Sequence, residues 1–392
     1  MKSYYSKNKI STFASKLFDP LIGGFSTSLF GVPKVGLSLF VKYLIKNPSL
    51  LDTKYSEFIK SNTFLWLDLN ENLMYPKELV TDELNYYLSD ENQLPANCSW
   101  KDIEDSIRGL IGEKEPGLVF VIDNANLLTS QFTKFAYRLM TLNRSFFSQV
   151  LFLFLSIEEI PNNEVTEKTL GQMYPLMMNS IDYFPLFDKE DMTLVKQNIW
   201  KEEPQEQADS AVKLAAGIPG LFRILHREFI KNGALPMNFN EMMQLLEIKH
   251  LFMNIWSSLD DSTQDEILKK DTFINDFLLR TGLKTTEGVW FSNDFEAFIA
   301  EIRAKTSKIT TSSTSIEKLL THQELILFNL LTENRGDVVS RDEIAQSIWE
   351  DQWLDKYSDW AIAKLISQLR KKTSAFEDIT IKTAQNQGFM RV

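Results

Sequence analysis

Four short apolar segments, separated by longer helical patterns, constrain the fold of this chain more than any other feature. Apolar residues occupy both alternations of each segment, which is typical of strands that are covered on both faces, as in parallel sheets. The segments are Ser26–Phe30, Phe64–Leu69, Leu118–Ile122 and Val150–Ile157. The helical patterns between them are Leu37–Ile45, Pro76–Leu88, Trp100–Ile111 and Gln131–Leu142. This repeated order of strand and helix predicts an open parallel sheet with helices on both faces.

The pattern changes along the chain and predicts several structural units. After an α/β domain, purely helical periodicity indicates a lid subdomain, and a helix-rich stretch with one strand-like segment indicates a compact module with a β-wing. A segment rich in serine and threonine is typical of a flexible linker, and the remaining residues are numerous enough for a separate domain. The predicted boundaries are 1–185 for the α/β domain, 186–245 for the lid, 246–304 for the first winged module, 305–315 for the linker and 316–392 for the last domain.

Composition excludes several classes of protein. The one cysteine, Cys98, rules out an internal disulfide framework and a thiolate zinc cluster, and three scattered histidines make a metal site unexpected. The longest apolar run, Val150–Leu155, is far shorter than the roughly 20 residues of a membrane span, and the N-terminus has no signal-peptide core. We therefore expect a cytoplasmic protein with no membrane contact and no bound metal.

The distribution of charge is more informative than its sum. The formal net charge of −11 argues against nucleic-acid binding by the chain as a whole, because phosphate binding requires basic side chains. Residues 1–60, however, hold nine lysines and three acidic residues, and 364–372 holds four cations and no acid. Any contact with nucleic acid is therefore expected to be local.

Residues 31–38, GVPKVGLS, have the spacing of the phosphate-binding loop GxxxxGK[ST]. In such loops backbone N–H groups surround phosphate, the lysine offsets its charge, and the hydroxyl holds magnesium. Leu37 occupies the lysine position, and its side chain can neither donate a hydrogen bond to phosphate nor offset the phosphate charge. Asp123, which ends an apolar strand, could hold a metal, but Asn124 cannot act as a base. The candidate nucleotide-binding residues are Gly31, Lys34, Gly36, Ser38 and Asp123.

The order of these motifs resembles that of AAA+ ATPases of the STAND and origin-recognition branch. Residues 215–221 resemble the glycine-x-proline signature with which that family starts a lid helix, and 277–283 with 290–292 resemble its winged-helix module. The resemblance covers roughly residues 15–303 and implies a P-loop-type parallel sheet domain with a helical lid, followed by a winged helix. Since Leu37 and Asn124 depart from the pattern, we expect a scaffold that is not an enzyme and has no catalytic residue. We expect no cofactor, and ATP is the candidate ligand if one binds.

The last domain has clear helical and strand patterns. Thr321 and Glu324 have capping-box spacing before an apolar stripe, and a second helix is expected near Ser340. In Asp359–Lys372 the apolar residues fall at i, i+3, i+4 and i+7, which indicates one face toward a core. Residues 379–383 and 388–392 predict a β-hairpin.

This domain closely resembles the OmpR/PhoB-type winged-helix DNA-binding domain of bacterial transcription regulators. Ser340-Arg341, Ile348-Trp349, the helix with its Leu369-Arg370-Lys371-Lys372 end, and Ile381-Lys382-Thr383 before Gly388-Phe389 carry the resemblance. It implies that helix 359–372 enters the major groove and the hairpin the minor groove. Gln385 replaces the family's usual arginine, so minor-groove attraction is expected to be weaker. The candidate DNA-binding residues are Lys364, Ser367, Gln368, Arg370, Lys371, Lys372, Thr383 and Gln385.

These observations favour a DNA-binding transcriptional regulator, in which a catalytically degenerate ATPase-like scaffold mediates self-association or senses a signal. The expected partners are double-stranded DNA and a second copy of the chain or another protein. Two alternatives stay open. In one, Lys34 and Asp123 support ATP binding, and the chain is a nucleotide switch. In the other, the chain belongs to a defence or mobile-element system and its winged helix contacts protein; salt dependence separates protein from DNA contact.

Overall fold

The computed structural model divides the chain into two compact units, residues 1–296 and 297–392. Each unit is described by itself. The residues described are 5–70, 76–89, 92–111, 117–129, 132–146, 149–201, 204–270, 272–310, 320–349, 359–373, 379–384 and 388–391. None of the helices in these ranges is long and apolar enough to span a bilayer.

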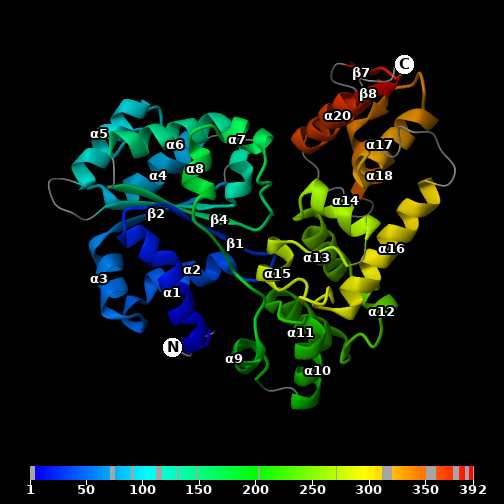
Figure 1. Ribbon diagram of the computed structural model, residues 1–392, viewed down its shortest axis with the longest axis horizontal. Helices are drawn as coiled ribbons and strands as arrows, with labels where there is room; N and C mark the ends of the chain where they lie inside the picture. Colours follow the sequence, from blue (N-terminus) through cyan, green and yellow to red (C-terminus); the bar gives the residue numbers. More distant parts are fainter. Residues whose placement is uncertain are drawn as a thin grey trace. The chain divides into compact units, whose positions relative to one another are not determined.

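A five-stranded sheet forms the centre of the first unit (Figure 1). Its order is β2-β3-β4-β1-β5 and all of its pairs are parallel, which confirms the predicted parallel sheet. Every residue of the two central strands β3 and β4 is buried, as the apolar runs on both alternations predict. The strands are β1 (Thr27–Phe30), β2 (Thr63–Asp68), β3 (Leu118–Asp123), β4 (Val150–Ser156) and β5 (Ile181–Tyr183).

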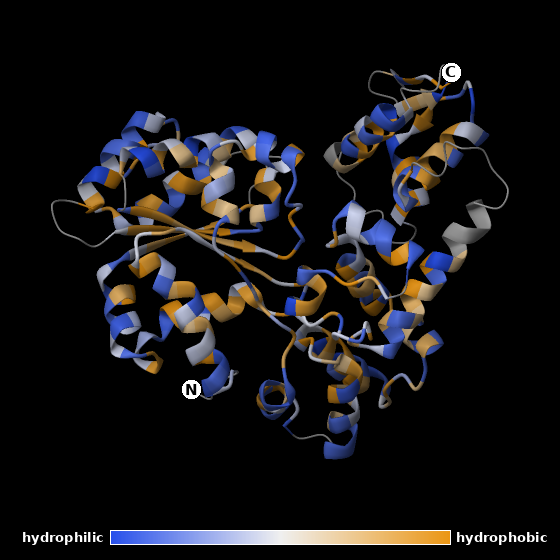
Figure 2. Ribbon diagram, viewed as in Figure 1, coloured by the Kyte–Doolittle hydropathy of each residue, from blue (hydrophilic) through white to orange (hydrophobic). Residues whose placement is uncertain are grey.

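Helices cover both faces of this sheet (Figure 1), and its strands are mainly hydrophobic (Figure 2) and buried. On one face lie α1 (Lys7–Ile22), α2 (Leu37–Lys46) and α3 (Thr53–Ser61), with the short η1 (Pro48–Leu50). On the other lie α4 (Pro76–Tyr87), α5 (Trp100–Ile111), α6 (Thr133–Ser145), α7 (Glu164–Leu170) and α8 (Met173–Met178), with η3 (Ala125–Thr129) after β3. The sequence patterns missed α1, α3, α7, α8 and β5. Helix α1 contains Pro20 and buries a lysine, but its apolar residues Ile10, Phe13, Leu17 and Leu21 have helical spacing, so its pattern is present in the sequence.

Helices alone continue the first unit beyond β5. The expected lid helices are present as α9 (Lys189–Ile199), α10 (Gln205–Ala215) and α11 (Pro219–Asn232). They are followed by α12 (Phe239–Gln244), α13 (Leu246–Ser257), α14 (Asp261–Lys269) and α15 (Asp276–Thr281). In place of the strand expected near 289–291 there is a single β-bridge between Lys284 and Trp290.

Helix α16 (Asn293–Thr310) extends into the segment expected to be a linker. Residues 305–310 of the predicted linker 305–315 are helical. Serine and threonine lower helix propensity only weakly, and a helix that has already formed can extend through them. Residues 311–315 lie outside the described residues.

Besides residues 297–310 of α16, the described part of the second unit contains three helices and a small antiparallel sheet. They are α17 (His322–Glu333), β6 (Val339–Ser340), α18 (Arg341–Trp349), α20 (Asp359–Thr373), β7 (Ile381–Ala384) and β8 (Gly388–Arg391), with sheet order β6-β8-β7. The capping box of Thr321 and Glu324 is present, as predicted. The stripe Ile362, Leu365, Ile366 and Leu369 is buried in one core with Phe328 and Phe389.

Candidate DNA-binding helix and phosphate loop

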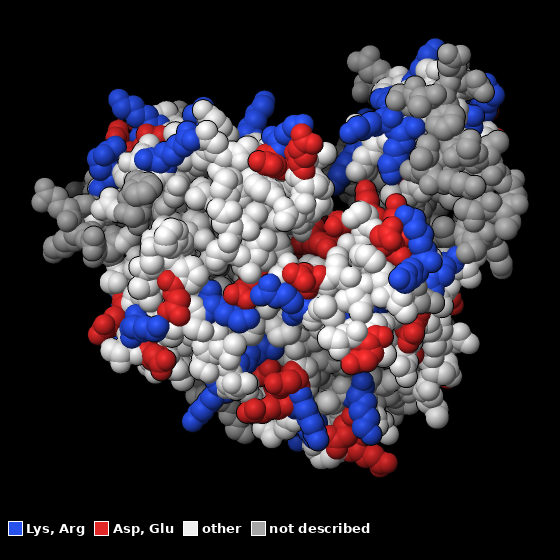
Figure 3. All heavy atoms as spheres, in the orientation of Figure 1, with Lys and Arg blue, Asp and Glu red and all other residues white. Residues whose placement is uncertain are grey.

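The face of α20 opposite its buried stripe carries polar and basic side chains. Lys364, Ser367 and Lys371 are exposed, and Gln368 is half-buried. They fall at i, i+3, i+4 and i+7, so the four residues share one side of the helix. Figure 3 shows lysine and arginine side chains gathered over this helix in the second unit. This face combines cations for phosphates with an amide that can donate and accept at a base edge.

Arg370 holds the hairpin β7–β8, here called the wing, against α20. Its Nε donates to the carbonyl oxygen of Ile381 at 2.9 Å, and a terminal nitrogen donates to Thr383 Oγ1 at 2.8 Å. Its guanidinium also lies 6.0 Å from the centre of the Phe389 ring. The planar fork of arginine suits such a double contact. The structure thus brings two of the predicted DNA-binding residues, Arg370 and Thr383, into contact with each other.

Lys372 is engaged within the second unit as well. Its Nζ donates to Glu324 Oε2 at 2.7 Å, and the Glu324 side chain is 1% exposed. The same carboxylate closes the capping box by accepting from the backbone N–H of Thr321. Since a buried charge needs a partner, Lys372 stabilises the start of α17. The predicted residue Gln385 lies outside the described residues, and Lys382, which the sequence reasoning did not select, is exposed on β7.

Substitution of Arg370 by Met is expected to release the wing. It removes two hydrogen bonds made by a charged donor, at about 1.5–3 kcal/mol each, while it keeps most of the side chain's bulk. We expect the free energy of unfolding of the second unit, measured by urea in the full chain, to fall by a few kcal/mol in total. Arg335→Met, at an exposed position in the turn after α17, is the matched control and should leave the unfolding curve unchanged. Equal stability of the two variants contradicts the clamp.

The loop between β1 and α2 has unusual backbone conformations at two positions. Gly36, the residue that caps α2, has φ +92°, and Lys34 has φ +62°. Glycine adopts this region readily, but a lysine there costs on the order of 1 kcal/mol or more, so its surroundings must hold it. The backbone N–H of Gly220 donates to the Lys34 carbonyl oxygen at 3.1 Å. A Cβ on Gly220 would lie 2.5 Å from Lys34 Cβ, so this contact requires glycine.

Ser38 and Asp123, two of the predicted nucleotide-binding residues, contact each other. Ser38 Oγ donates to Asp123 Oδ1 at 2.8 Å. Burial raises the pKa of the Asp123 carboxyl, and the hydrogen bond from Ser38 partly opposes this effect. Asn124, at φ +58°, directs its Nδ2 to Asp68 Oδ1 at 2.7 Å. The amide at the usual position of the catalytic base is therefore bound to the end of the neighbouring strand.

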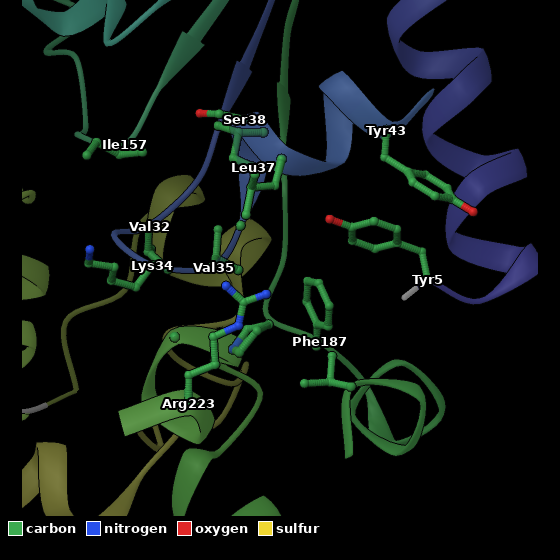
Figure 4. Close-up of a pocket in the computed structure, with 15 residues that line it drawn as sticks. Tyr5, Val32, Lys34, Val35, Leu37, Ser38, Tyr43, Ile157, Phe187 and Arg223 are labelled. Atoms are coloured by element: carbon green, nitrogen blue, oxygen red, sulfur yellow. The ribbon is translucent and has the colours of Figure 1, made fainter. Parts of the chain in front are cut away.

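A cavity of about 520 Å³ lies beside the loop (Figure 4). Of the predicted nucleotide-binding residues, Lys34, Gly36 and Ser38 line it, whereas Gly31 and Asp123 do not. Sequence reasoning missed Tyr5 from the N-terminal segment and Arg223 from α11, which complete the wall. Arg223 follows the Pro219-Gly220 signature by one helical turn, and this spacing is the signal that could have identified it.

The N-terminal segment is anchored to the lid by a buried ion pair. Lys9 Nζ lies 3.0 Å from Asp191 Oδ2, and the two side chains are 5% and 1% exposed. Asp191 Oδ1 also accepts from the backbone N–H of Ser6 at 2.8 Å. The Lys9 ammonium lies 3.9 Å from the centre of the Phe187 ring. This anchor places Tyr5 at the cavity wall.

Glu159, in the loop after β4, connects the sheet to the helices that follow the lid. Its Oε1 accepts from Asn275 Nδ2 at 2.8 Å and its Oε2 from the backbone N–H of Asp260 at 3.2 Å. Its own N–H donates to the Ser258 carbonyl oxygen. Burial, and then the charge of Asp260, raises the pKa of the Glu159 carboxyl from 4.5 to about 7. At this junction the protonated form of the Glu159 carboxyl is therefore favoured.

The junction makes stability depend on pH. Between pH 4.5 and 7 the unfolded chain loses this proton while the folded chain keeps it, so stability falls as pH rises through that window. The loss is at most about 3 kcal/mol above pH 7. Glu159→Gln should be more stable than the wild type at pH 8 and differ less from it at pH 5, as measured by urea midpoints. A difference that is the same at both pH values contradicts this assignment.

Comparison with known proteins identifies the second unit. Residues 314–391 match the family model described as "Transcriptional regulatory protein, C terminal". The C-terminal region is thus a DNA-binding winged helix of transcriptional regulators, as predicted. No curated protein matches the sequence.

Solved structures that are similar over nearly the whole chain include the following three. The Orc1 protein of Aeropyrum pernix in complex with DNA is 11% identical, with 98% of this chain and 87% of that chain covered at a TM-score of 0.41. The Walker-type ATPase PABY2304 of Pyrococcus abyssi is 14% identical, with 97% and 92% covered at 0.41. The RuvB Holliday junction branch migration motor of Thermotoga maritima is 12% identical, with 100% and 95% covered at 0.35.

Proposed function

We propose that this chain is a DNA-binding transcriptional regulator in which the first unit is a scaffold without ATPase activity that mediates self-association or senses a signal. The observation that carries the proposal is the exposed face of α20 in a unit of the transcriptional regulatory family. Lys364 and Lys371 provide charge for phosphates, while Ser367 and Gln368 provide groups for base edges.

Two positions, one after the phosphate loop and one after β3, support the absence of hydrolysis. Leu37 lines the cavity at the position where ATPases place a lysine, so a triphosphate would meet an apolar side chain. The amide of Asn124 does not accept a proton at neutral pH, so it cannot act as a general base. Its Nδ2 is also engaged, because it donates to Asp68 Oδ1. Ser38 and Asp123 are the residues that would hold a magnesium ion, but they lack the rest of the machinery.

A gel-shift experiment with the full chain and fragments of its own genomic neighbourhood tests the DNA-binding part. We expect binding to particular fragments in excess competitor DNA, with an affinity that falls steeply as salt rises, because phosphate contacts release counterions. Absence of specific binding contradicts the proposal. Capture of a protein partner with little salt dependence supports contact with protein in its place.

One observation favours a nucleotide switch as a second candidate. The hydrogen bond between Ser38 and Asp123 brings together a hydroxyl and a carboxylate, the kind of oxygen groups that magnesium prefers. Calorimetry with ATP and magnesium separates the two functions. Micromolar binding that Asp123→Ala abolishes would favour the switch, and no heat of binding would favour the scaffold.

A further inference from the structure

The cavity beside the phosphate loop has walls that are mainly apolar. Val32, Val35, Leu37 and Leu39 face it from the loop and α2, and Val195 faces it from the lid. Its volume of about 520 Å³ lies within the range of about 300–1,000 Å³ that is usual for small-molecule sites. Such a surface fits a ligand with a substantial hydrocarbon part.

Aromatic rings close one end of this cavity. The ring centres of Tyr5 and Tyr43 are 5.2 Å apart, and those of Tyr5 and Phe187 are 5.8 Å apart. Figure 4 shows Tyr5 beside Phe187, with its hydroxyl directed toward the loop. Tyr5 is anchored at this end, because Asp191 holds Ser6 and Lys9, which follow it in the chain. The cavity is therefore preformed at its aromatic end.

The charged residues of the lining have one sign. Lys34 and Arg223 are its charged members, both are exposed, and neither forms an ion pair within the described part of the chain. Figure 4 shows Arg223 rising from α11 toward Val35, at the apolar walls, whereas the Lys34 amine points away from the tyrosine rings. A single guanidinium among apolar groups suits a planar monoanion, which its fork can bind through two hydrogen bonds.

We propose that this cavity binds a small amphipathic carboxylate, with its hydrocarbon part against Val35, Leu37 and Phe187 and its carboxylate on Arg223. This inference rests on the proposed function in one respect, since it gives the scaffold a signal to sense. A triphosphate carries several charges and would meet the apolar side chain of Leu37 in this lining. A carboxylate places one charge at Arg223 and leaves Leu37 in contact with hydrocarbon.

Calorimetry of the full chain with octanoate and phenylacetate tests the proposal, with neutral octanamide as the matched ligand. We expect saturable binding of at least one carboxylate and at least tenfold weaker binding of octanamide, because the amide lacks the charge that pairs with the guanidinium. Arg223→Met should weaken carboxylate binding at least tenfold. Arg227→Met is the control on the same helix, since Arg227 pairs with Glu247 and does not line the cavity.

The outcomes separate this inference from the proposed function. Carboxylate binding that survives Arg223→Met, or equal binding of octanamide, overturns the inference and leaves the regulator in place. No binding of either carboxylate, when thermal unfolding shows the wild type to be folded, also overturns it. Micromolar binding and turnover of ATP with magnesium contradict the proposed loss of ATPase activity. Specific DNA binding is scored separately, by gel shift.

Discussion

Replacement of Gln368 by Ala is expected to weaken binding to the specific DNA site by about 1–3 kcal/mol, or roughly 5- to 150-fold, and to relax the preference for one base pair. The glutamine amide lies on the exposed side of α20 and can make a paired contact to a base edge. Removal of that contact costs affinity only where the matching base is present. Binding to unrelated DNA should change little.

Replacement of Lys371 by Ala should have the complementary effect. Affinity is expected to fall to a similar extent for every DNA sequence, and the slope of log affinity against log salt should decrease by about 1. Lys231→Ala, which removes one exposed charge from α11 in the first unit, is the control and should leave both quantities unchanged. Identical behaviour of the Gln368 and Lys371 variants would contradict the separation of base and phosphate contacts.

Asp191→Ala is expected to destabilise the first unit by about 3–5 kcal/mol, because it leaves the ammonium of Lys9 buried without a counter-charge. Burial lowers the pKa of Lys9, and the charge of Asp191 opposes that effect. Removal of Asp191 is therefore expected to lower the pKa of Lys9 further. The backbone N–H of Ser6 also loses its acceptor. Urea unfolding of the full chain measures the change.

Two further variants give this prediction its control. Glu164→Ala breaks the ion pair with Lys168, whose side chains are 77% and 73% exposed, and should cost less than about 1 kcal/mol. The double variant Lys9→Met, Asp191→Leu replaces the buried pair by apolar groups and should recover much of the lost stability. Equal effects of Asp191→Ala and Glu164→Ala would show that burial does not govern the pair.

The sheet could be predicted from sequence because its signal is local. Apolar residues on both alternations identify a buried parallel strand, and β3 and β4 have that pattern throughout. Strand β5 has only three residues, all half-buried, so its sequence lacks the apolar run that identifies a buried strand. Helix α1 buries Lys9, which reads as a surface residue until its partner Asp191, far along the chain, is known.

The candidate sites were predictable where motif spacing determines geometry. Ser38 and Asp123 meet because Asp123 ends β3 and Ser38 lies in the first turn of α2, after β1, at the same edge of the sheet. The roles of Arg370 and Lys372 were not predictable, since a basic helix end is equally suited to phosphate and to partners within the fold. Their acceptors, on the wing and on α17, come from other elements. Arg223 and Tyr5 meet only through tertiary packing of the lid.

A nuclease footprint of the full chain on DNA from its own genomic neighbourhood tests the central claim most directly. We expect a protected segment at concentrations that leave unrelated DNA uncovered. The double variant Gln368→Ala, Lys371→Ala should lose this protection while the protein stays folded. A footprint that the double variant keeps in full, or none for the wild type, would contradict the assignment of α20 as the helix that binds DNA.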